Sequence, residues 1–300
     1  MIRNIITIIF LLVISCSEKN KTLPSSTGNF SEIIFVTEDV LWEKKLKEIV
    51  NNIFEKEIEG LTQIEPSYKI IQVNHEEFNG LLKTHKNIII VSKNSTTSNH
   101  KNKWSKPQLV INLNWEENAK NITHQFDKIK RIFDFNERKN IRAKIARLSK
   151  SNAEKKVNRF FEINIKIPKK YTVIQNDSSL FWASFNPIKA EEIQHLLVFS
   201  FSIIDTNQIN KVIFFKTDSV LQKHLLGEPK NSFVQIEPLY KPYLKDNIYR
   251  GLWRLKNGFM GGPFLLKTYY VKNKVIIALG IIYAPNKSKR NYIKELEAIL

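Results

Sequence analysis

The sequence predicts an α+β protein, in which an N-terminal α/β layer is joined by a long helix to a C-terminal antiparallel sheet with covering helices. Three observations support this prediction. Up to residue 113, short β-prone runs alternate with helical segments, an order typical of an α/β layer. Between residues 115 and 161, apolar residues recur at helical spacing. Beyond residue 163, most β-prone runs follow one another with short connections, which favours an antiparallel sheet.

The N-terminal half is predicted to hold four strands, at residues 32–36, 68–73, 87–91 and 109–113. A helix between the first two is indicated by an apolar stripe at the spacing i, i+3, i+4, i+7 and i+8, made of Leu46, Ile49, Val50, Ile53 and Phe54. We expect Asp39 to cap this helix and Gly60 to end it. Residues 76–82 are expected to form a further short helix.

The segment from residue 115 to residue 161 is predicted to be one long helix or a broken pair that bridges the two halves. Asn114 and Glu117 have the spacing of a capping arrangement at its start. Its most basic part is residues 138–156. A solvated lysine-rich face explains this charge more simply than a nucleic-acid contact does.

The C-terminal half is predicted to contain strands at residues 163–167, 171–175, 180–185, 196–202 and 233–236. Thr206 is expected to cap a helix that runs to Leu226, where Gly227 and Pro229 end it.

The last 50 residues or so predict a meander of three strands and a final helix. Asn257-Gly258 favours a type I′ turn between residues 250–255 and a strand that begins near Phe259. Gly261, Gly262 and Pro263 are expected to interrupt that second strand, which resumes over residues 264–271. Residues 275–283 are so uniformly apolar that both faces must be covered, which predicts the central strand. The closing residues 287–300 predict a helix that forms one cover.

Composition limits the classes of protein to be considered. The 300 residues are 42% hydrophobic, enough for one large core or two smaller ones. Lys and Arg number 47 against 29 Asp and Glu, for a net charge of +18, which favours anionic partners. The excess is mostly Lys scattered among Asn and Ile rather than Arg in runs. A solvated basic surface therefore explains it more simply than a dedicated anion-binding face.

The N-terminus predicts an export signal followed by a lipid anchor. Residues 1–15 combine a positive start with a short apolar run, and Val13-Ile14-Ser15-Cys16 resembles a bacterial lipobox, in which Cys16 becomes the lipidated first residue. An ordinary signal peptide with an incidental cysteine is the alternative. Cys16 is the one cysteine of the chain, which excludes an internal disulfide. We expect a flexible tether at residues 16–30 and two halves at residues 31–150 and 151–300. Ser17, rather than Asp, after the cysteine resembles lipoproteins sent to an outer membrane.

One short motif occurs twice. Residues 63–69 recur almost unchanged as residues 235–241, with Gln-Ile-Glu-Pro at the start of each copy. A duplicated half and a coincidence at a strand end both explain this recurrence. The sequence around the two copies does not match, which favours coincidence.

Several motifs of the C-terminal run belong together. Arg250-Gly-Leu-Trp253, Met260-Gly-Gly-Pro-Phe264 and Tyr283-Ala-Pro285, behind a lipoprotein signal, resemble the family of Bacteroidota lipoproteins catalogued as domain of unknown function 4837. Similar spacings near Glu65-Pro66 and Phe181-Trp182 extend the resemblance over nearly the whole mature chain. The resemblance implies an envelope location and a fold, but no chemistry.

The sequence offers one group of candidate binding residues and no catalytic ones. No metal-ligand spacing of His, nucleophile elbow, Walker loop or dinucleotide fingerprint occurs, so no metal or cofactor is expected. The candidate binding group joins guanidinium, ammonium and backbone donors to an indole, and consists of Arg250, Trp253, Gly261, Gly262, Lys289 and Arg290. It could bind a carboxylate, a phosphate or a sugar. The simpler interpretation buries Trp253 in the core and uses the cations to cap the sheet edge.

Two functions therefore stand. The preferred one is a non-catalytic binding or scaffold lipoprotein of the envelope, with a protein or an anionic glycan as partner and no nucleic acid expected. The alternative is a hydrolase or transferase acting on glycan or peptide, for which Glu65 or Glu237 could only be nominated as acid or base.

Overall fold

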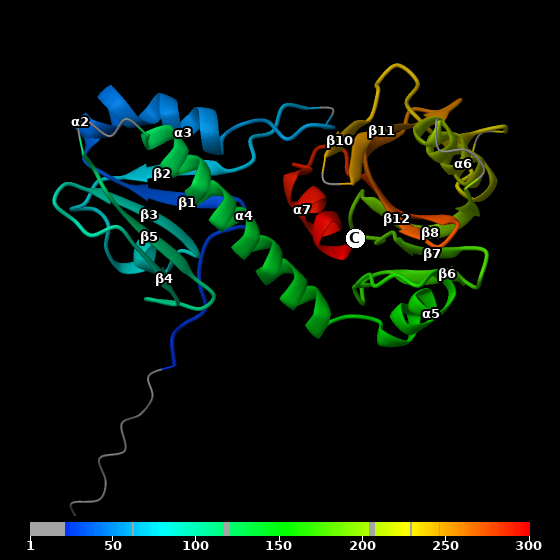
Figure 1. Cartoon of the computed structure of the whole chain (residues 1–300), viewed down its shortest axis with the longest axis horizontal. Coiled ribbons are helices and arrows are strands. Elements are labelled where there is room, and N and C mark those ends of the chain that lie inside the picture. Colours follow the sequence, from blue (N-terminus) through cyan, green and yellow to red (C-terminus); the bar gives the residue numbers. More distant parts are fainter. Residues whose placement is uncertain (1–21, 62, 117–120, 204–207, 229, 246) are drawn as a thin grey trace, which may run out of the picture.

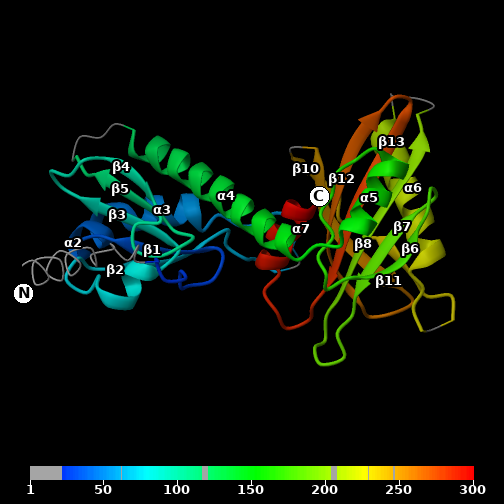
Figure 2. The same cartoon turned by 90° about the horizontal axis from the view of Figure 1, so that it is seen from below.

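The computed structural model describes residues 22–61, 63–116, 121–203, 208–228, 230–245 and 247–300. It contains a five-stranded and an eight-stranded sheet, with one long helix running from the first towards the second (Figures 1 and 2). The α+β prediction is confirmed. No helix among the described residues is both long and apolar enough to cross a membrane. Cys16, Thr206, Glu117 and Pro229 lie outside the described residues.

The first sheet has the strand order β2-β1-β3-β5-β4. All four predicted strands are present, as β1 (Glu32–Val36), β2 (Lys69–Val73), β3 (Asn87–Ser92) and β5 (Leu109–Asn114), and they pair in parallel. The fifth strand, β4 (Ser98–Lys101), runs antiparallel along the edge and was not predicted. Its sequence is Ser-Asn-His-Lys, without an apolar alternation, because an exposed edge strand has no buried face to fill.

The predicted first helix is a continuous helical run of three segments, α2 (Asp39–Leu41), a π-helical turn (Trp42–Leu46) and α3 (Lys47–Phe54). Four of its five stripe residues are buried against the sheet, and Ile49 is partly buried there. The predicted ends were wrong. Asp39 is the first helical residue, and its carboxylate accepts hydrogen bonds from the side chains of Gln72 and Asn74, which lower its pKa. The helix ends at Phe54, before Gly60, and a 3-10 helix (Gly80–Thr84) takes the place of the short helix expected at residues 76–82.

The predicted tether is docked onto this half from Pro24 onward. The amide of Ser26 donates to the Lys106 carbonyl oxygen, and the amide of Thr27 donates to that of Thr84. The chain therefore joins the folded part several residues before residue 31.

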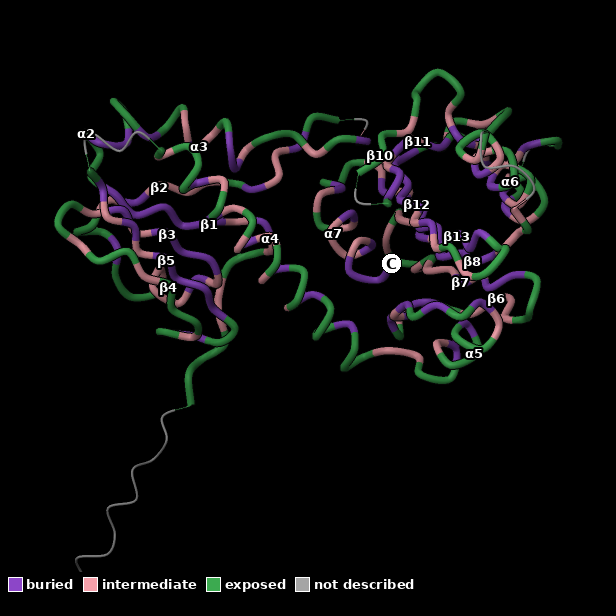
Figure 3. The backbone as a smooth tube through the Cα atoms, viewed as in Figure 1, coloured by how far each residue is buried: buried purple, intermediate pink, exposed green. Residues whose placement is uncertain are grey.

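The bridging segment is a broken pair of helices, α4 (Ile122–Arg147) and α5 (Ser151–Phe161). The two halves share α4. The first part of α4 buries Phe126, Ile129 and Phe133 against the five-stranded sheet, whereas its last part buries Ile141 and Ile145 in the core of the other half. Figure 3 shows buried positions recurring along the length of α4. Asn114 does not cap α4, because it ends β5 and donates its side-chain amide to Glu116.

The second sheet has the order β10-β11-β12-β13-β8-β7-β6, and its neighbours along this path pair antiparallel. Its strands are β6 (Thr172–Asn176), β7 (Phe181–Phe185), β8 (Ile193–Ser202), β9 (Phe233–Ile236), β10 (Tyr243–Lys245), β11 (Ile248–Lys256), β12 (Gly261–Val271) and β13 (Lys274–Tyr283). β13 lies between β12 and β8 and is buried on both faces, which confirms the predicted central strand. One face is covered by α6 (Ile209–His224) and the other by α5 and α7 (Arg290–Ile299) (Figure 2).

Three predictions for this half were wrong. Residues 163–167 form no strand, although Ile163, Ile165 and Ile167 are buried in the core. Gly261, Gly262 and Pro263 do not interrupt a strand but begin β12, in unbroken register with residues 254, 253 and 252 of β11. The hairpin between β11 and β12 is wider than a type I′ turn, because the Leu255 amide reaches across to the Met260 carbonyl oxygen and only Asn257 of the Asn-Gly pair has positive φ.

Candidate functional site

Arg250 on β11 forms an ion pair with a residue of the final helix. Its Nη2 donates to Glu297 Oε1 of α7 at 2.7 Å, and both side chains are mostly buried. Its Cβ lies against Gly60, where φ is +85° and an added Cβ would come within 2.8 Å of it. Arg250 therefore connects the meander, α7 and the loop from the first half.

Trp253 lies in the core, with 4% of its surface exposed. Its Nε1 donates to the Ile282 carbonyl oxygen of β13 at 3.0 Å. Gly262 is its partner on β12, and a Cβ there would lie 2.2 Å from the same oxygen. Gly262 thus leaves room for this indole contact, and it exposes no amide to a ligand.

Lys289 and Arg290 form the start of α7, where Glu65 of the first half caps the helix. The Glu65 carboxylate is 8% exposed and accepts from the Ser288 hydroxyl at 2.5 Å, the Lys289 amide at 2.7 Å and the Arg290 amide at 2.9 Å. The Arg290 Nη1 donates to the Pro66 carbonyl oxygen at 3.0 Å. These contacts satisfy helix amides that would otherwise lack acceptors, and the negative carboxylate suits the positive end of the helix dipole.

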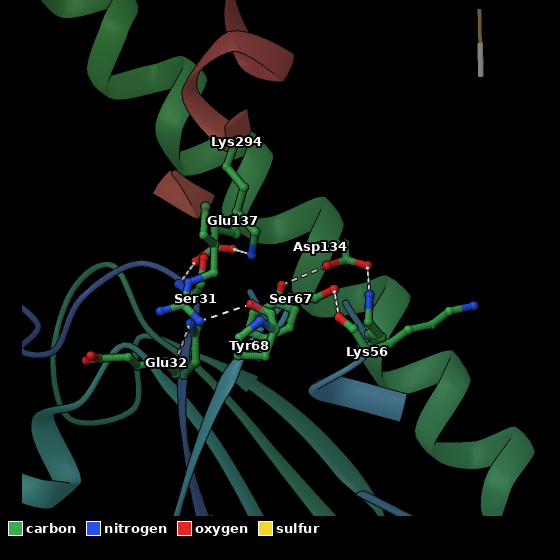
Figure 4. A network of polar contacts seen from close by, with 12 residues as sticks. Ser31, Glu32, Lys56, Ser67, Tyr68, Asp134, Glu137 and Lys294 are labelled. Atoms are coloured by element: carbon green, nitrogen blue, oxygen red, sulfur yellow. Dashed lines mark hydrogen bonds and ion pairs between the residues drawn. The ribbon is translucent and has the colours of Figure 1, made fainter. Parts of the chain in front are cut away.

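A second buried network joins the halves farther along α7 (Figure 4). Glu137 of α4 is 3% exposed and accepts from the Ser31 amide and from Lys294 Nζ of α7, both at 2.5 Å. Burial lowers the pKa of Lys294, and the neighbouring Glu137 opposes this shift. Lys294 also lies over the Tyr68 ring, whose hydroxyl donates to Asp134, and burial raises the pKa of that hydroxyl. A buried pair of this kind fixes the relative position of the elements that carry it, because separating them leaves a buried charge.

The structure therefore brings Arg250, Lys289 and Arg290 together around α7, whereas Trp253 and Gly262 are buried in the sheet and Gly261 is exposed at the start of β12. Arg250 Nη2, Arg290 Nη1 and Trp253 Nε1 each donate to another part of the protein. Of the two nominated carboxylates, Glu65 caps α7, and Glu237 lies 3.6 Å from Arg254 Nε and accepts from the Leu239 amide. Among the described residues, no three His, Cys, Asp or Glu side chains are placed to hold a metal ion.

An open hollow of about 470 Å³ lies near the start of β11, between α6 and the edge strand β10. Its lining is mostly aromatic and aliphatic and consists of Asn210, Phe214, Lys241, Pro242, Tyr243, Leu244 and Tyr249. The Tyr249 hydroxyl donates to Asn210 Oδ1 at 2.5 Å, and the Phe214 and Tyr249 rings meet edge to face at 5.1 Å. Burial raises the pKa of Tyr249.

The segment that contributes to this hollow also carries exposed apolar side chains. Tyr243 and Leu244 are 42% and 47% exposed, and Leu239 in the preceding loop is 93% exposed. Apolar surface concentrated around a hollow marks an interaction site more often than scattered apolar residues do. The sequence analysis missed this site, although the density of tyrosines at positions 240, 243 and 249 was a signal for it.

The family comparison covers the chain in two parts. The family described as Domain of unknown function (DUF4837) matches residues 150–300, just over half of the chain. The chain belongs to the DUF4837 family. A second family, described as Domain of unknown function (DUF8532), matches residues 26–149. No curated protein matches the chain significantly.

The DUF4837 match is narrower than the resemblance suggested, because it starts at residue 150, just before α5, rather than covering nearly the whole mature chain. All six candidate residues and the whole hollow lie within the DUF4837 part. Glu65, Glu137 and Ser31 lie in the DUF8532 part. The two buried carboxylates thus join segments that match two different families.

Proposed function

We propose that this DUF4837 protein is a lipoprotein of the cell envelope, of Bacteroidota type, that binds or organises a partner rather than catalysing a reaction. Support for the envelope location comes from the sequence. The apolar run before Val13-Ile14-Ser15-Cys16 has the length of a signal region, and Cys16 is the one thiol available for lipidation. The anchor holds the protein on a membrane, and Ser17 favours the outer membrane as its destination.

One observation carries the choice of binding over catalysis. Three charged residues at the meander have side chains that could take part in a reaction. All three instead make contacts that connect α7 to the rest of the protein, and they are Arg250, Glu65 and Arg290. A general acid or base must instead reach a substrate proton. The open hollow between α6 and β10 is lined mainly by apolar rings, which suits recognition.

The alternative, an envelope hydrolase or transferase acting on glycan or peptide, needs a carboxylate in an open site. Glu237 is the nominated acid that remains, and it faces Arg254. The expected partners are an envelope protein or an anionic glycan. Nucleic acid is not favoured, because residues 138–156 carry charge without an aromatic surface on which bases could stack.

A Cys16→Ala variant tests the anchor. We expect wild-type protein in the membrane fraction with a diacylglycerol mass on its N-terminal peptide, and Cys16→Ala protein without that mass and released from membranes. Ser17→Ala is the matched control and should remain lipidated. A Cys16→Ala protein that fractionates with membranes at the wild-type level would contradict the proposal.

A further inference from the structure

We propose that His85 is a pH-sensitive latch for residues 24–29, here called the strap. The strap stays docked on the first half at neutral pH and is released when the imidazole takes up a proton. It lies between Cys16 and the folded part of the chain. The inference therefore rests on the proposed lipid anchor for its biological role, and it names how the reach of that anchor is regulated.

The strap is docked by a short series of backbone hydrogen bonds. The amides of Ser26 and Thr27 donate to the carbonyl oxygens of Lys106 and Thr84, at 3.2 and 3.0 Å. The amide of Lys86 donates back to the Thr27 carbonyl oxygen at 3.1 Å. No side chain of the strap is fully buried. A segment with so little buried surface opens more easily than the sheet beneath it.

The His85 side chain packs against the strap and is buried, with 6% of the residue exposed. Its Nδ1 lies 3.0 Å from the Asn87 carbonyl oxygen. Its Nε2 is buried and has no hydrogen-bond partner among the described residues. Gly28 lies directly against this nitrogen, because a Cβ added to Gly28 would come within 1.9 Å of it. The strap therefore covers the ring nitrogen that lacks a partner.

The docked strap offers no acceptor to a doubly protonated imidazole, and none of its residues carries an ionisable side chain. The carboxylate that faces the ring belongs to Glu32 of β1, whose Oε2 lies 3.9 Å from Nε2, too far for a hydrogen bond. Glu32 already accepts from the backbone and side-chain amides of Asn29. Burial lowers the pKa of His85 and the charge of Lys86 adds to this shift, whereas the Asn87 backbone and Glu32 oppose it.

Falling pH should therefore release the strap. Once the strap is open, water reaches the ring and the pKa of His85 returns towards 6.5. Below pH 6.5 the open form binds a proton more readily than the docked form does. Docking is thus most stable above pH 6.5 and weakens as the pH falls from there towards the lowered pKa. The pKa of Glu32 is lowered from 4.5, so this carboxylate stays charged throughout that change.

Release would lengthen the connection to the membrane. Six residues in extended conformation span at most about 20 Å. At acidic pH the folded part could therefore move that much farther from the lipid anchor than it can at neutral pH.

Hydrogen exchange of the full-length lipidated protein in detergent micelles, followed by NMR at pH 7.5 and 5.0, tests the latch. After correction for the intrinsic effect of pH on exchange, opening at the Ser26 and Thr27 amides should increase about 5- to 30-fold at pH 5.0. The upper figure is the limit for a group of pKa 6.5 that binds no proton when docked. The Thr37 amide, which donates to the Val73 carbonyl oxygen in the same half, is the internal reference and should change less than about twofold.

Three variants separate the latch from a general effect of pH. His85→Gln should remove the pH dependence at the strap. His100→Gln is the matched control, because His100 is exposed on β4, and it should keep the wild-type response. Gly28→Ala should leave the Ser26 and Thr27 amides unprotected at both pH values, because its Cβ would collide with the His85 ring.

Three results would overturn the proposal: exchange at Ser26 and Thr27 that does not respond to pH, a pH response retained in His85→Gln, or an equal response at Thr37. If His85→Gln lacks protection already at pH 7.5, the imidazole signal of wild-type His85 decides. Its titration should coincide with the loss of protection, and a different midpoint would overturn the latch. Cys16→Ala protein should exchange like wild type, so failure of the lipid anchor and failure of the latch are distinguishable.

Discussion

Glu65 should contribute far more to the free energy of unfolding than Glu237, the equivalent residue in the second copy of the Gln-Ile-Glu-Pro motif. Replacing Glu65 with Ala removes three hydrogen bonds at the start of α7. Loss of a helix cap costs about 1 kcal/mol, loss of a carboxylate at the helix N-terminus about 0.5–1 kcal/mol, and loss of the hydrogen bond from the exposed Ser288 hydroxyl about 0.5–1.5 kcal/mol. We therefore expect Glu65→Ala to destabilise the docking of α7 by roughly 2–4 kcal/mol. Glu65→Gln should destabilise the docking of α7 less than Glu65→Ala does, because the glutamine keeps one acceptor oxygen.

Native-state hydrogen exchange measures this directly. A loss of about 2–4 kcal/mol should speed exchange of the α7 amides roughly 30- to 900-fold. Glu237→Ala is the control from the second Gln-Ile-Glu-Pro copy, and its partly exposed pair at 3.6 Å from Arg254 should cost less than about 1 kcal/mol. Equal effects of the two substitutions, or unchanged exchange in α7 of Glu65→Ala, would refute the assignment of Glu65 as the cap.

Two further predictions concern the sheet. Gly262→Ala should cost about 3 kcal/mol or more in urea unfolding, because its Cβ would lie 2.2 Å from the Ile282 carbonyl oxygen. Gly261→Ala, whose Cβ would lie 3.0 Å from the nearest atom, should cost less, and the opposite order would contradict the packing described. Burial lowers the pKa of His195 from 6.5 to about 4, and Trp182 Nε1 donates to its unprotonated Nδ1. Between pH 6.5 and 4 the unfolded chain takes up a proton that the folded chain refuses, so His195 should lower stability as pH falls through this window. His195→Gln should flatten the pH dependence, and an unchanged slope would show that His195 is not its source.

Much of the fold follows from local patterns. Residues 275–283 are apolar at nearly every position, and only a strand covered on both faces accommodates such a run, as β13 does. The stripe from Leu46 to Phe54 and the closing helix were predicted for the same reason, since each buries one face. These patterns depend on which face is buried and not on which partner buries it.

Partners far apart in the sequence account for what was missed. Glu65 lies in a segment with the composition of a loop. Its role as the cap of α7 depends on the amides of Lys289 and Arg290, more than 220 residues later. Residues 163–167 have the apolar content of a strand, but they bury it without a neighbouring strand. The hollow likewise arises because β10 places Leu244 on the same face as Tyr249, near Asn210 and Phe214 of α6, a neighbourhood that no local pattern specifies. Local chemistry at the meander therefore indicated binding residues where the fold uses them for its own contacts.

The polar residues at the meander hold α7 in place and do not act in a reaction. We propose to measure the urea unfolding midpoint of Arg250→Ala and Glu297→Ala in parallel, because each variant removes one partner of the same 2.7 Å ion pair. Both variants should unfold at lower urea than the wild type, since both side chains are mostly buried and each loss leaves a charge without its partner. A wild-type midpoint in both variants would contradict this account, because Arg250 would then contribute nothing to the docking of α7.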